Sequence, residues 1–245
     1  MTANPIQIVP MRGEVLAAPV KTAHLTYRGG PVLSAVQVTT LFWGPAWDQD
    51  PLAGIAQKLN EFFGFVLTSA LLDQLGEYSV PGMTIGHGSL VGRRALVSVP
   101  PSSVADGDVQ KLLQQEIPSP PPDSLYLLYL PPGVTVNLSG AASCSGFCGY
   151  HSDIGGRLFY GVLPYPDCSG CAGGQPILDA MTATSSHELS EAITDPVPGQ
   201  GWYDDVNGEI GDICAWQTKT LGGYTVQLEW SNRAGRCVFG TAPRA

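Results

Sequence analysis

Two side chains at helical spacing could hold a metal ion in the C-terminal half of this 245-residue chain. His187 and Glu191 are four residues apart, so in a helix they project from the same face, one turn apart. An imidazole and a carboxylate placed in this way can chelate one divalent ion. Glu188 directly follows the first ligand, where its carboxylate could accept a proton from water activated by the metal. The segment therefore predicts a metal centre with a general base beside it.

The same segment departs from the HExxH pattern of zinc peptidases at one position. Glu191 occupies the place where that pattern has its second histidine. A carboxylate is an accepted zinc ligand, but its negative charge makes the ion a weaker Lewis acid. A carboxylate-rich site also suits iron or manganese. We therefore expect Zn²⁺, with Fe²⁺ and Mn²⁺ as alternatives, and the residues alone leave both the metal and peptidase activity open.

The third ligand must come from downstream of the helix. Asp195 follows His187 by eight residues, which in a continuous helix places it about 12 Å away, too far to share an ion. Asp212 and Glu209 follow at a spacing similar to that of gluzincins such as thermolysin, where an acid on a later element is the third ligand. We expect Asp212, with Glu209 second. The nearby Asp204-Asp205-Val206-Asn207 predicts a turn or a structural Ca²⁺ site.

His151 is the other histidine with a chemical interpretation. It follows a stretch with two cysteines and two glycines, Cys144 to Tyr150, which we expect to be a tight loop holding the imidazole rigidly. His151 could stabilise a transition state or bind the metal. Together with His187 and Glu191 it would form a two-histidine, one-carboxylate set, which suits iron(II). A histidine that only hydrogen-bonds to the loop backbone is an equal alternative.

Charge and hydropathy exclude some classes of partner. The formal net charge is −9, and an acidic protein repels phosphate backbones, so we expect no nucleic-acid binding. No apolar run reaches the length of about 18 residues that a membrane span needs. Residues 1–14 lack the basic start and apolar run of a secretory leader. We expect an extracellular or periplasmic protein if a leader was removed, and a cytoplasmic one otherwise.

Six cysteines all lie in the C-terminal half: Cys144, Cys148, Cys168, Cys171, Cys214 and Cys237. A zinc knuckle built from the two close pairs is one interpretation. Three disulfides that staple loops around the site are favoured, because the intervening sequence is rich in Gly and Pro and has no compact finger pattern. We expect Cys214 to pair with Cys237 and the other four cysteines to pair among themselves. Three disulfides would imply an oxidising compartment.

Hydrophobic periodicity and breaker residues predict the remaining elements. We expect residues 1–30 to form an arm or a loose first strand and residues 139–153 to form a loop. Helices are expected at 52–75, with Gly64 as a point where that helix could break, at 109–117 and at 176–194. Strands are expected at 32–43, within 78–99, and at 124–130, 157–165 and 224–230. The chain shows no repeats and no linker, so residues 1–245 should form a single domain.

Two stretches resemble known families. Tyr27-Arg28-Gly29-Gly30-Pro31-Val32-Leu33, followed by Leu41-Phe42-Trp43-Gly44, is similar to the start of the EXORDIUM (phosphate-induced) proteins. That resemblance implies an exported fold more than an activity. The segment 186–196, with the sequence SHELSEAITDP, resembles uncharacterised, mostly microbial sequences described as HExxE-type zinc metallopeptidases of the zincin kind.

These observations predict an α+β, loop-rich, zincin-like fold in which a mixed sheet has an edge strand near 157–165 and the metal helix lies behind it. The expected function is a metal-dependent hydrolase that acts on a peptide or another small substrate, with Glu188 as base. One alternative is a non-hydrolytic metalloenzyme that uses His151, His187 and Glu191. Another is a secreted binding or signalling protein whose metal is structural.

Overall fold

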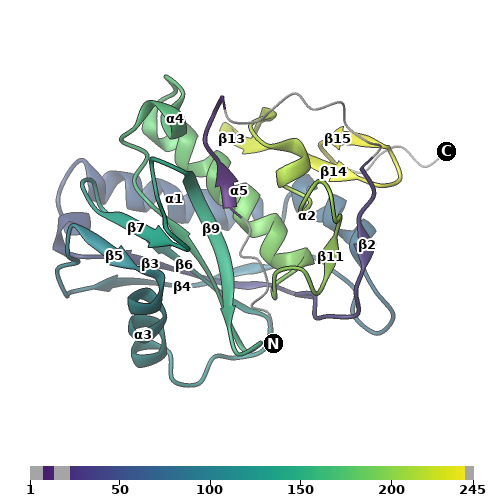
Figure 1. Cartoon of the computed structure of the whole chain (residues 1–245), viewed down its shortest axis with the longest axis horizontal. Coiled ribbons are helices and arrows are strands. Elements are labelled where there is room, and N and C mark those ends of the chain that lie inside the picture. The colour runs from purple at the N-terminus through teal and green to yellow at the C-terminus, as the bar shows by residue number, and fades with distance from the viewer. Residues whose placement is uncertain (1–7, 14–22, 241–245) are drawn as a thin grey trace.

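A six-stranded mixed sheet is the centre of the computed structural model, which describes residues 8–13 and 23–240 (Figure 1). In spatial order its strands are β1 (Ile8–Pro10), β9 (Phe147–Ile154), β10 (Leu158–Leu163), β6 (Ser124–Tyr129), β3 (Gln37–Trp43) and β4 (Ser89–Leu96). The strands β10, β6, β3 and β4 run parallel to one another, whereas β9 is antiparallel to β10 and β1 is antiparallel to β9. The structure thus confirms the expected α+β class and mixed sheet.

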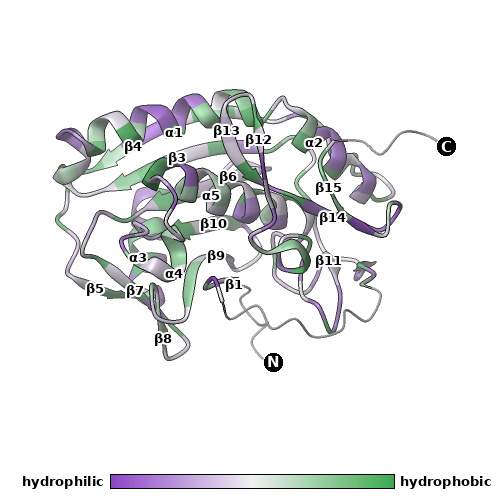
Figure 2. Ribbon diagram, turned by 90° about the horizontal axis from the view of Figure 1, so that it is seen from above, coloured by the Kyte–Doolittle hydropathy of each residue, from purple (hydrophilic) through white to green (hydrophobic). Residues whose placement is uncertain are grey.

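Both faces of the sheet are covered, which explains why β6 and β10 are buried along their whole lengths. One face carries α1 (Leu52–Val66), α2 (Ala70–Leu75) and α5 (Ile177–Thr194). The other face carries α3 (Asp106–Glu116) and a small sheet of β5 (Ser103–Ala105), β7 (Thr135–Leu138) and β8 (Ala141–Ala142). Hydrophilic and hydrophobic residues alternate along α1 (Figure 2), and its apolar side packs into the core.

The C-terminal part wraps around α5 in short elements. These are α4 (Ser169–Ala172), the hairpin β12 (Thr218–Leu221) and β13 (Tyr224–Gln227), the pair β14 (Glu229–Ser231) and β15 (Arg236–Val238), and β11 (Trp202–Tyr203), which pairs with β2 (Thr26–Tyr27) from the N-terminal part. The described residues also include the 3-10 turns η1 (Pro45–Asp48), η2 (Gly76–Tyr78) and η3 (Asp212–Cys214). The strand expected at 224–230 is therefore two strands that pair in different sheets.

Several expected boundaries shift in the structure. The helix expected at 52–75 breaks at 67–69 and not at Gly64, because the Ser69 side chain accepts a hydrogen bond from the Leu71 amide and starts α2. Within the expected N-terminal arm, residues 1–7 and 14–22 lie outside the described residues. Inside the described part, Val9 and Leu25 are fully buried, so that part is not loose.

The prediction of an edge strand at 157–165 is wrong. The strand β10 lies inside the sheet, hydrogen-bonded to β6 on one side and to β9 on the other. The strand beyond it, β9, comes from the stretch 139–153 that we expected to be a loop. Its glycine lowers β propensity, but tertiary contacts override that tendency: Gly149 faces α5 at close range, and Cys148 is bonded to α4.

All six cysteines form disulfides: Cys144–Cys168, Cys148–Cys171 and Cys214–Cys237. The predicted Cys214–Cys237 bond and the pairing of the other four among themselves are confirmed. Two of the bonds tie β9 and the turn before it to the region of α4, and the third ties η3 to β15. Because the sulfurs are bonded, the cysteines are not free to act as thiolate ligands. The disulfides indicate an oxidising compartment.

Replacing both Cys214 and Cys237 by serine should lower the free energy of unfolding by about 3 kcal/mol, the usual scale for a loop of about 20 residues. The bond separates residues 23 positions apart and ties the end of η3 to β15. Urea unfolding followed by tryptophan fluorescence measures the change. An unfolding midpoint equal to that of the wild type would show that the bond does not constrain the unfolded chain.

Across residues 8–13 and 23–240, none of the helices combines the length and the apolar character that crossing a bilayer requires.

Candidate metal centre

The helix that carries the predicted ligands, α5, is buried on all sides from Ala180 to Thr194. Its apolar stripe, which includes Met181, Leu189 and Ile193, lies in the main core as expected. The opposite side is not a solvated face, because loops and hairpins of the C-terminal part cover it (Figure 1). Hydroxyl groups on this helix bond to its own backbone about one turn earlier, so their burial costs little. The predicted ligands therefore lie in the interior.

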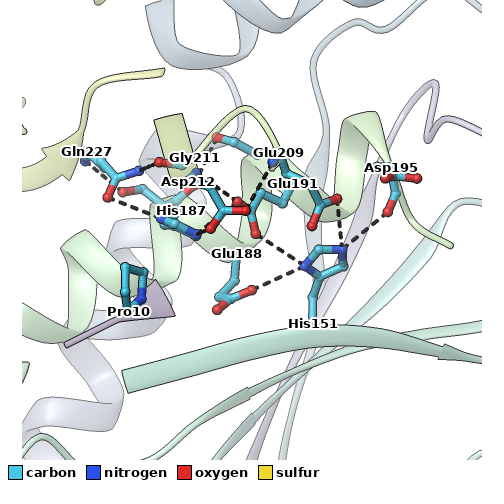
Figure 3. Close-up of polar contacts among 12 residues, drawn as sticks. Pro10, His151, His187, Glu188, Glu191, Asp195, Glu209, Gly211, Asp212 and Gln227 are labelled. Carbon is cyan, nitrogen blue, oxygen red and sulfur yellow. Dashed lines mark hydrogen bonds and ion pairs between the residues drawn. The ribbon is translucent and has the colours of Figure 1, made fainter. Parts of the chain in front are cut away.

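His187, Glu191 and Asp212 come together as predicted. The Nε2 atom of His187 lies 2.9 Å from Oε1 of Glu191 and 3.9 Å from Oδ1 of Asp212. The Asp212 amide also donates to Glu191 Oε1 at 3.1 Å, which fixes η3 against the helix. One ligand atom from each of the three residues lies within 4.8 Å of the others. This group, seen in Figure 3, has the composition of a metal-binding set.

A second group shares Glu191 and consists of His151, Glu191 and Glu209. His151 Nε2 lies 3.6 Å from Glu209 Oε1, and its Nδ1 lies 3.4 Å from Glu191 Oε2. The expectation that His151 sits on a tight loop is wrong, because it lies on β9 and faces α5 (Figure 3). The two histidines thus belong to different groups of candidate ligands joined by Glu191. The two candidates for the third ligand, Asp212 and Glu209, likewise divide between the groups.

Glu188 lies between the helix and β9. Its Oε2 atom is 3.3 Å from Nδ1 of His151, while its Oε1 atom has no hydrogen-bond partner among the described residues. Gly149 of β9 makes room for this carboxylate, since a Cβ atom at Gly149 would lie 3.0 Å from Glu188 Oε1 and 2.8 Å from Cγ2 of Thr184. The carboxylate is therefore anchored at one oxygen and unpaired at the other.

Unpaired buried atoms show that the cluster fits a cation. Within the described part of the chain, hydrogen-bond partners are missing for His187 Nε2, Glu191 Oε2 and both carboxylate oxygens of Glu209, although these residues are fully buried. His187 Nε2 is close to Glu191 Oε1 but is not aligned for a hydrogen bond. Leaving buried polar atoms unpaired is costly. A divalent ion bound by these atoms would satisfy them.

The charge balance leads to the same conclusion. Burial would lower the pKa of His151, but the neighbouring carboxylates of Glu188 and Glu191 raise it to about 10. Burial and the neighbouring Glu191 raise the pKa values of Glu209 and Asp212 well above the usual range. Without a cation, the carboxylates outnumber the imidazoles, so some of them must be protonated. A cation would supply the missing positive charge and lower those pKa values.

Gln227 of β13 orients His187, and sequence reasoning missed it. Its Oε1 atom lies 3.1 Å from His187 Nδ1, and its Nε2 donates to the Gly211 carbonyl at 2.9 Å. With Nδ1–H donating to Gln227, His187 Nε2 is left with its lone pair towards the acids, as metal ligation requires. A signal was present in the sequence: Gln227 and Glu229 alternate with apolar residues around 224–230, and both are buried.

Replacing Gln227 by leucine should weaken metal binding by about 10- to 100-fold, the usual effect of losing an outer hydrogen bond to a ligand histidine. The cause is the loss of the acceptor that fixes the tautomer and orientation of His187. Competition with a chromophoric chelator measures the affinity. Gln217→Leu is the matched control, because Gln217 is exposed and its side chain hydrogen-bonds to the Cys237 sulfur. Equal affinities for the two variants would remove Gln227 from this role.

Gly211 is a second contributor that sequence reasoning missed, and it carries no functional group. A Cβ atom there would lie 2.9 Å from Glu191 Oε1 and 2.9 Å from the imidazole Nδ1 and Cγ atoms of His187. Only glycine lets the backbone before η3 pass this close to both ligands. The following residue, Asp212, then reaches the group.

Other candidates fall outside the cluster. The Asp195 carboxylate is not part of either ligand group; it accepts hydrogen bonds from the Gly199, Gln200 and Gly201 amides and so closes the turn after α5. Its carbonyl lies 3.2 Å from His151 Nε2.

The acidic loop after the helix forms a turn, one of the two expected alternatives. Asp204 accepts hydrogen bonds from the Val206 and Asn207 amides. Among the described residues, no candidate ligand group includes Asp204 or Asp205. The loop therefore shows the geometry of a turn.

Comparison of the chain with models of protein families, with curated proteins and with solved structures finds no match.

Proposed function

We propose that the protein is a metal-dependent hydrolase that cleaves peptide bonds. The observation that carries the proposal is the position of Glu188, which lies next to the ligands His187 and Glu191 with one oxygen held and the other unpaired among the described residues. A structural metal site needs no unpaired base at its border, whereas hydrolysis does. The resemblance of segment 186–196 to sequences described as zinc metallopeptidases supports the same class.

In this proposal His187, Glu191 and Asp212 hold the ion, with Zn²⁺ as the first candidate and Fe²⁺ or Mn²⁺ as alternatives. Such an ion would polarise a carbonyl group and lower the pKa of water. Glu188 accepts the proton of the attacking water at Oε1, since Oε2 is held by His151. Glu188 then delivers that proton to the leaving amine.

His151 has a separate role. Its Nδ1 lies 3.3 Å from Glu188 Oε2 and 3.4 Å from Glu191 Oε2, and these carboxylates favour the imidazolium form. A positive charge next to the base stabilises the oxyanion that forms when water attacks a carbonyl. The complete burial of His151 excludes water and strengthens this interaction.

The proposed substrate is an extended polypeptide that pairs with β9. This strand takes the place of residues 157–165 as the expected peptide-binding strand, because it lies next to α5 and carries His151. Pairing through backbone groups holds a peptide extended beside the site and is independent of most of its side chains. Three disulfides support an extracellular or periplasmic location for such an enzyme.

Two alternatives have weaker support. A non-hydrolytic centre with two histidines and one carboxylate requires His151 and His187 on one ion, yet the two fall in different ligand groups. A binding or signalling protein with a structural metal is favoured by the complete burial of both histidines. A structural metal does not explain why Glu188 Oε1 has no hydrogen-bond partner among the described residues.

The test is metal analysis of the purified protein followed by a screen of quenched fluorescent peptides. We expect close to one equivalent of metal and cleavage that stops on addition of a chelator and returns with Zn²⁺. A protein that binds metal but cleaves no peptide or ester would contradict the proposal and favour a structural ion.

A further inference from the structure

A short piece of the chain lies along the proposed peptide-binding strand. β1 pairs antiparallel with β9, with Ile8 opposite Tyr150 and Val9 opposite Gly149. It also contacts α5 and η3, the two elements that supply the metal ligands. Figure 3 shows Pro10 close to His187 on the β9 side of the helix. A Cβ atom at Gly149 would lie 3.0 Å from Glu188 Oε1, so Val9 pairs with the residue of β9 that faces the proposed base.

The segment is held by its backbone as a bound peptide would be. The indole Nε1 of Trp216 donates to the Pro10 carbonyl at 2.8 Å, and the Arg12 amide donates to the Gly170 carbonyl at 2.8 Å. Val9 is fully buried and packs against the Cys148–Cys171 disulfide. All of these contacts are made with other parts of the chain, so contacts from outside the segment determine its conformation.

The Arg12 side chain of the segment is held by several specific contacts. The Arg12 guanidinium stacks on the Trp216 ring, 4.0 Å from its centroid. Its Nη2 donates to Gln175 Oε1 at 2.8 Å, and its Nε lies 3.5 Å from the Cys171 carbonyl. An aromatic face together with two acceptors is selective for a planar guanidinium. Gly173 carries no side chain, which lets the arginine stem pass against the end of α4.

This recognition site is connected to the metal centre. The Trp216 amide donates to Gln227 Oε1 at 3.1 Å, and the same oxygen lies 3.1 Å from His187 Nδ1. The residue that stacks on Arg12 is therefore one hydrogen bond from the residue that orients a metal ligand. A peptide held at this point lies beside the site and not at a remote surface.

We propose that the segment 8–12 occupies the peptide-binding position along β9 as an internal, peptide-like ligand, and that Trp216 and Gln175 form an arginine subsite. The inference rests on the proposed function and adds a substrate class to it: extended polypeptides with arginine two residues after the residue that occupies the position of Pro10. It also makes the segment a competitor of substrate, since a peptide must displace β1 to pair with β9.

The experiment measures binding in place of cleavage. In the full-length chain, Val9→Asp with Arg12→Ala should detach the segment, because a carboxylate cannot be buried against the disulfide and the guanidinium contacts are lost. The matched control is Val91→Asp with Arg28→Ala, since Val91 is 55% exposed and Arg28 also stacks on an aromatic ring, that of Tyr203. The probe is a fluorescein-labelled peptide with the sequence of residues 6–13, Ile-Gln-Ile-Val-Pro-Met-Arg-Gly.

Fluorescence polarisation with a chelator present should show that the probe binds the detached variant at least tenfold more tightly than it binds the wild type or the control. A probe with alanine in place of arginine should bind the detached variant at least tenfold more weakly. Adding Trp216→Ala to the detached variant should remove that difference. Because no metal or turnover is involved, the result stands or fails separately from the proposed hydrolysis.

Absence of probe binding to the detached variant, or equal binding to the wild type, would overturn the internal-ligand proposal. Equal binding of the arginine and alanine probes would overturn the arginine subsite. If the double variant does not fold by circular dichroism, Arg12→Ala alone is used with hydrogen exchange across β9. Faster exchange at residues 147–150 than in Arg28→Ala supports the proposal, and unchanged exchange refutes it.

Discussion

Replacing Glu188 by glutamine should leave the metal content unchanged and lower turnover by about a hundredfold or more, the usual scale for a lost general base. Glutamine keeps the size of the side chain and can still contact His151, but it cannot accept a proton at the position of Oε1. Elemental analysis and initial rates on a peptide found by the screen give the two quantities. A variant that is full of metal and inactive is the expected result.

Glu116→Gln is the matched control for this substitution, because Glu116 lies at the end of α3, on the other face of the sheet, and pairs with Arg94 near the surface. It should keep both metal and activity. If Glu188→Gln cleaved a metal-requiring substrate as fast as the wild type, the proposed role of Glu188 would be wrong. Hydrolysis would then proceed without Glu188 as the group that accepts the proton of the attacking water.

Replacing His187 by alanine should abolish stoichiometric metal binding, and Glu191→Gln should weaken it more than the roughly 10- to 100-fold loss typical of an outer partner. His187 contributes the imidazole of its group, and Glu191 belongs to both candidate ligand groups. Both purified variants should contain less metal than the wild type, whereas Glu188→Gln should contain as much metal as the wild type. Elemental analysis after dialysis against a weak chelator makes the comparison.

His87→Ala is the control for the histidine, since His87 is half-exposed and pairs with Asp73 at the surface. Circular dichroism confirms that each variant retains the fold, which we expect because the apolar stripe of α5 is unchanged. Full metal content in His187→Ala would exclude His187 as a ligand and leave the group of His151, Glu191 and Glu209 as the binding site.

The local part of the site could be predicted because helical geometry is local. The spacing of His187 and Glu191 fixes their common face once the helix is assigned, and the helix is bounded by Pro176 and Pro196 in the sequence. The choice of Asp212 rested on a spacing seen in other metal enzymes, and the structure places its Oδ1 3.9 Å from His187 Nε2. Predicting these residues does not require the order of strands in the sheet.

The sheet edge could not be predicted because strand order is a property of tertiary structure. The segment at 157–165 has the same apolar character whether it lies inside a sheet or beside its edge. The sequence of β9 is typical of a loop because its glycine and its cysteine are small for packing reasons that only α5 and α4 reveal. Consequently the sequence identifies His151 as a candidate but does not predict its place on a strand that faces Glu188.

The two glycines that border the cluster should tolerate substitution as poorly as the metal ligands do. Gly149 and Gly211 carry no donor, acceptor or charge in a side chain, yet a methyl group on either would meet a carboxylate or an imidazole at 3.0 Å or less. In a saturation library selected for metal retention or cleavage, alanine at these two positions should be depleted as strongly as substitutions of the ligands. The positions at which substitutions are depleted would therefore mark the metal centre at these two glycines as clearly as at its acids and histidines.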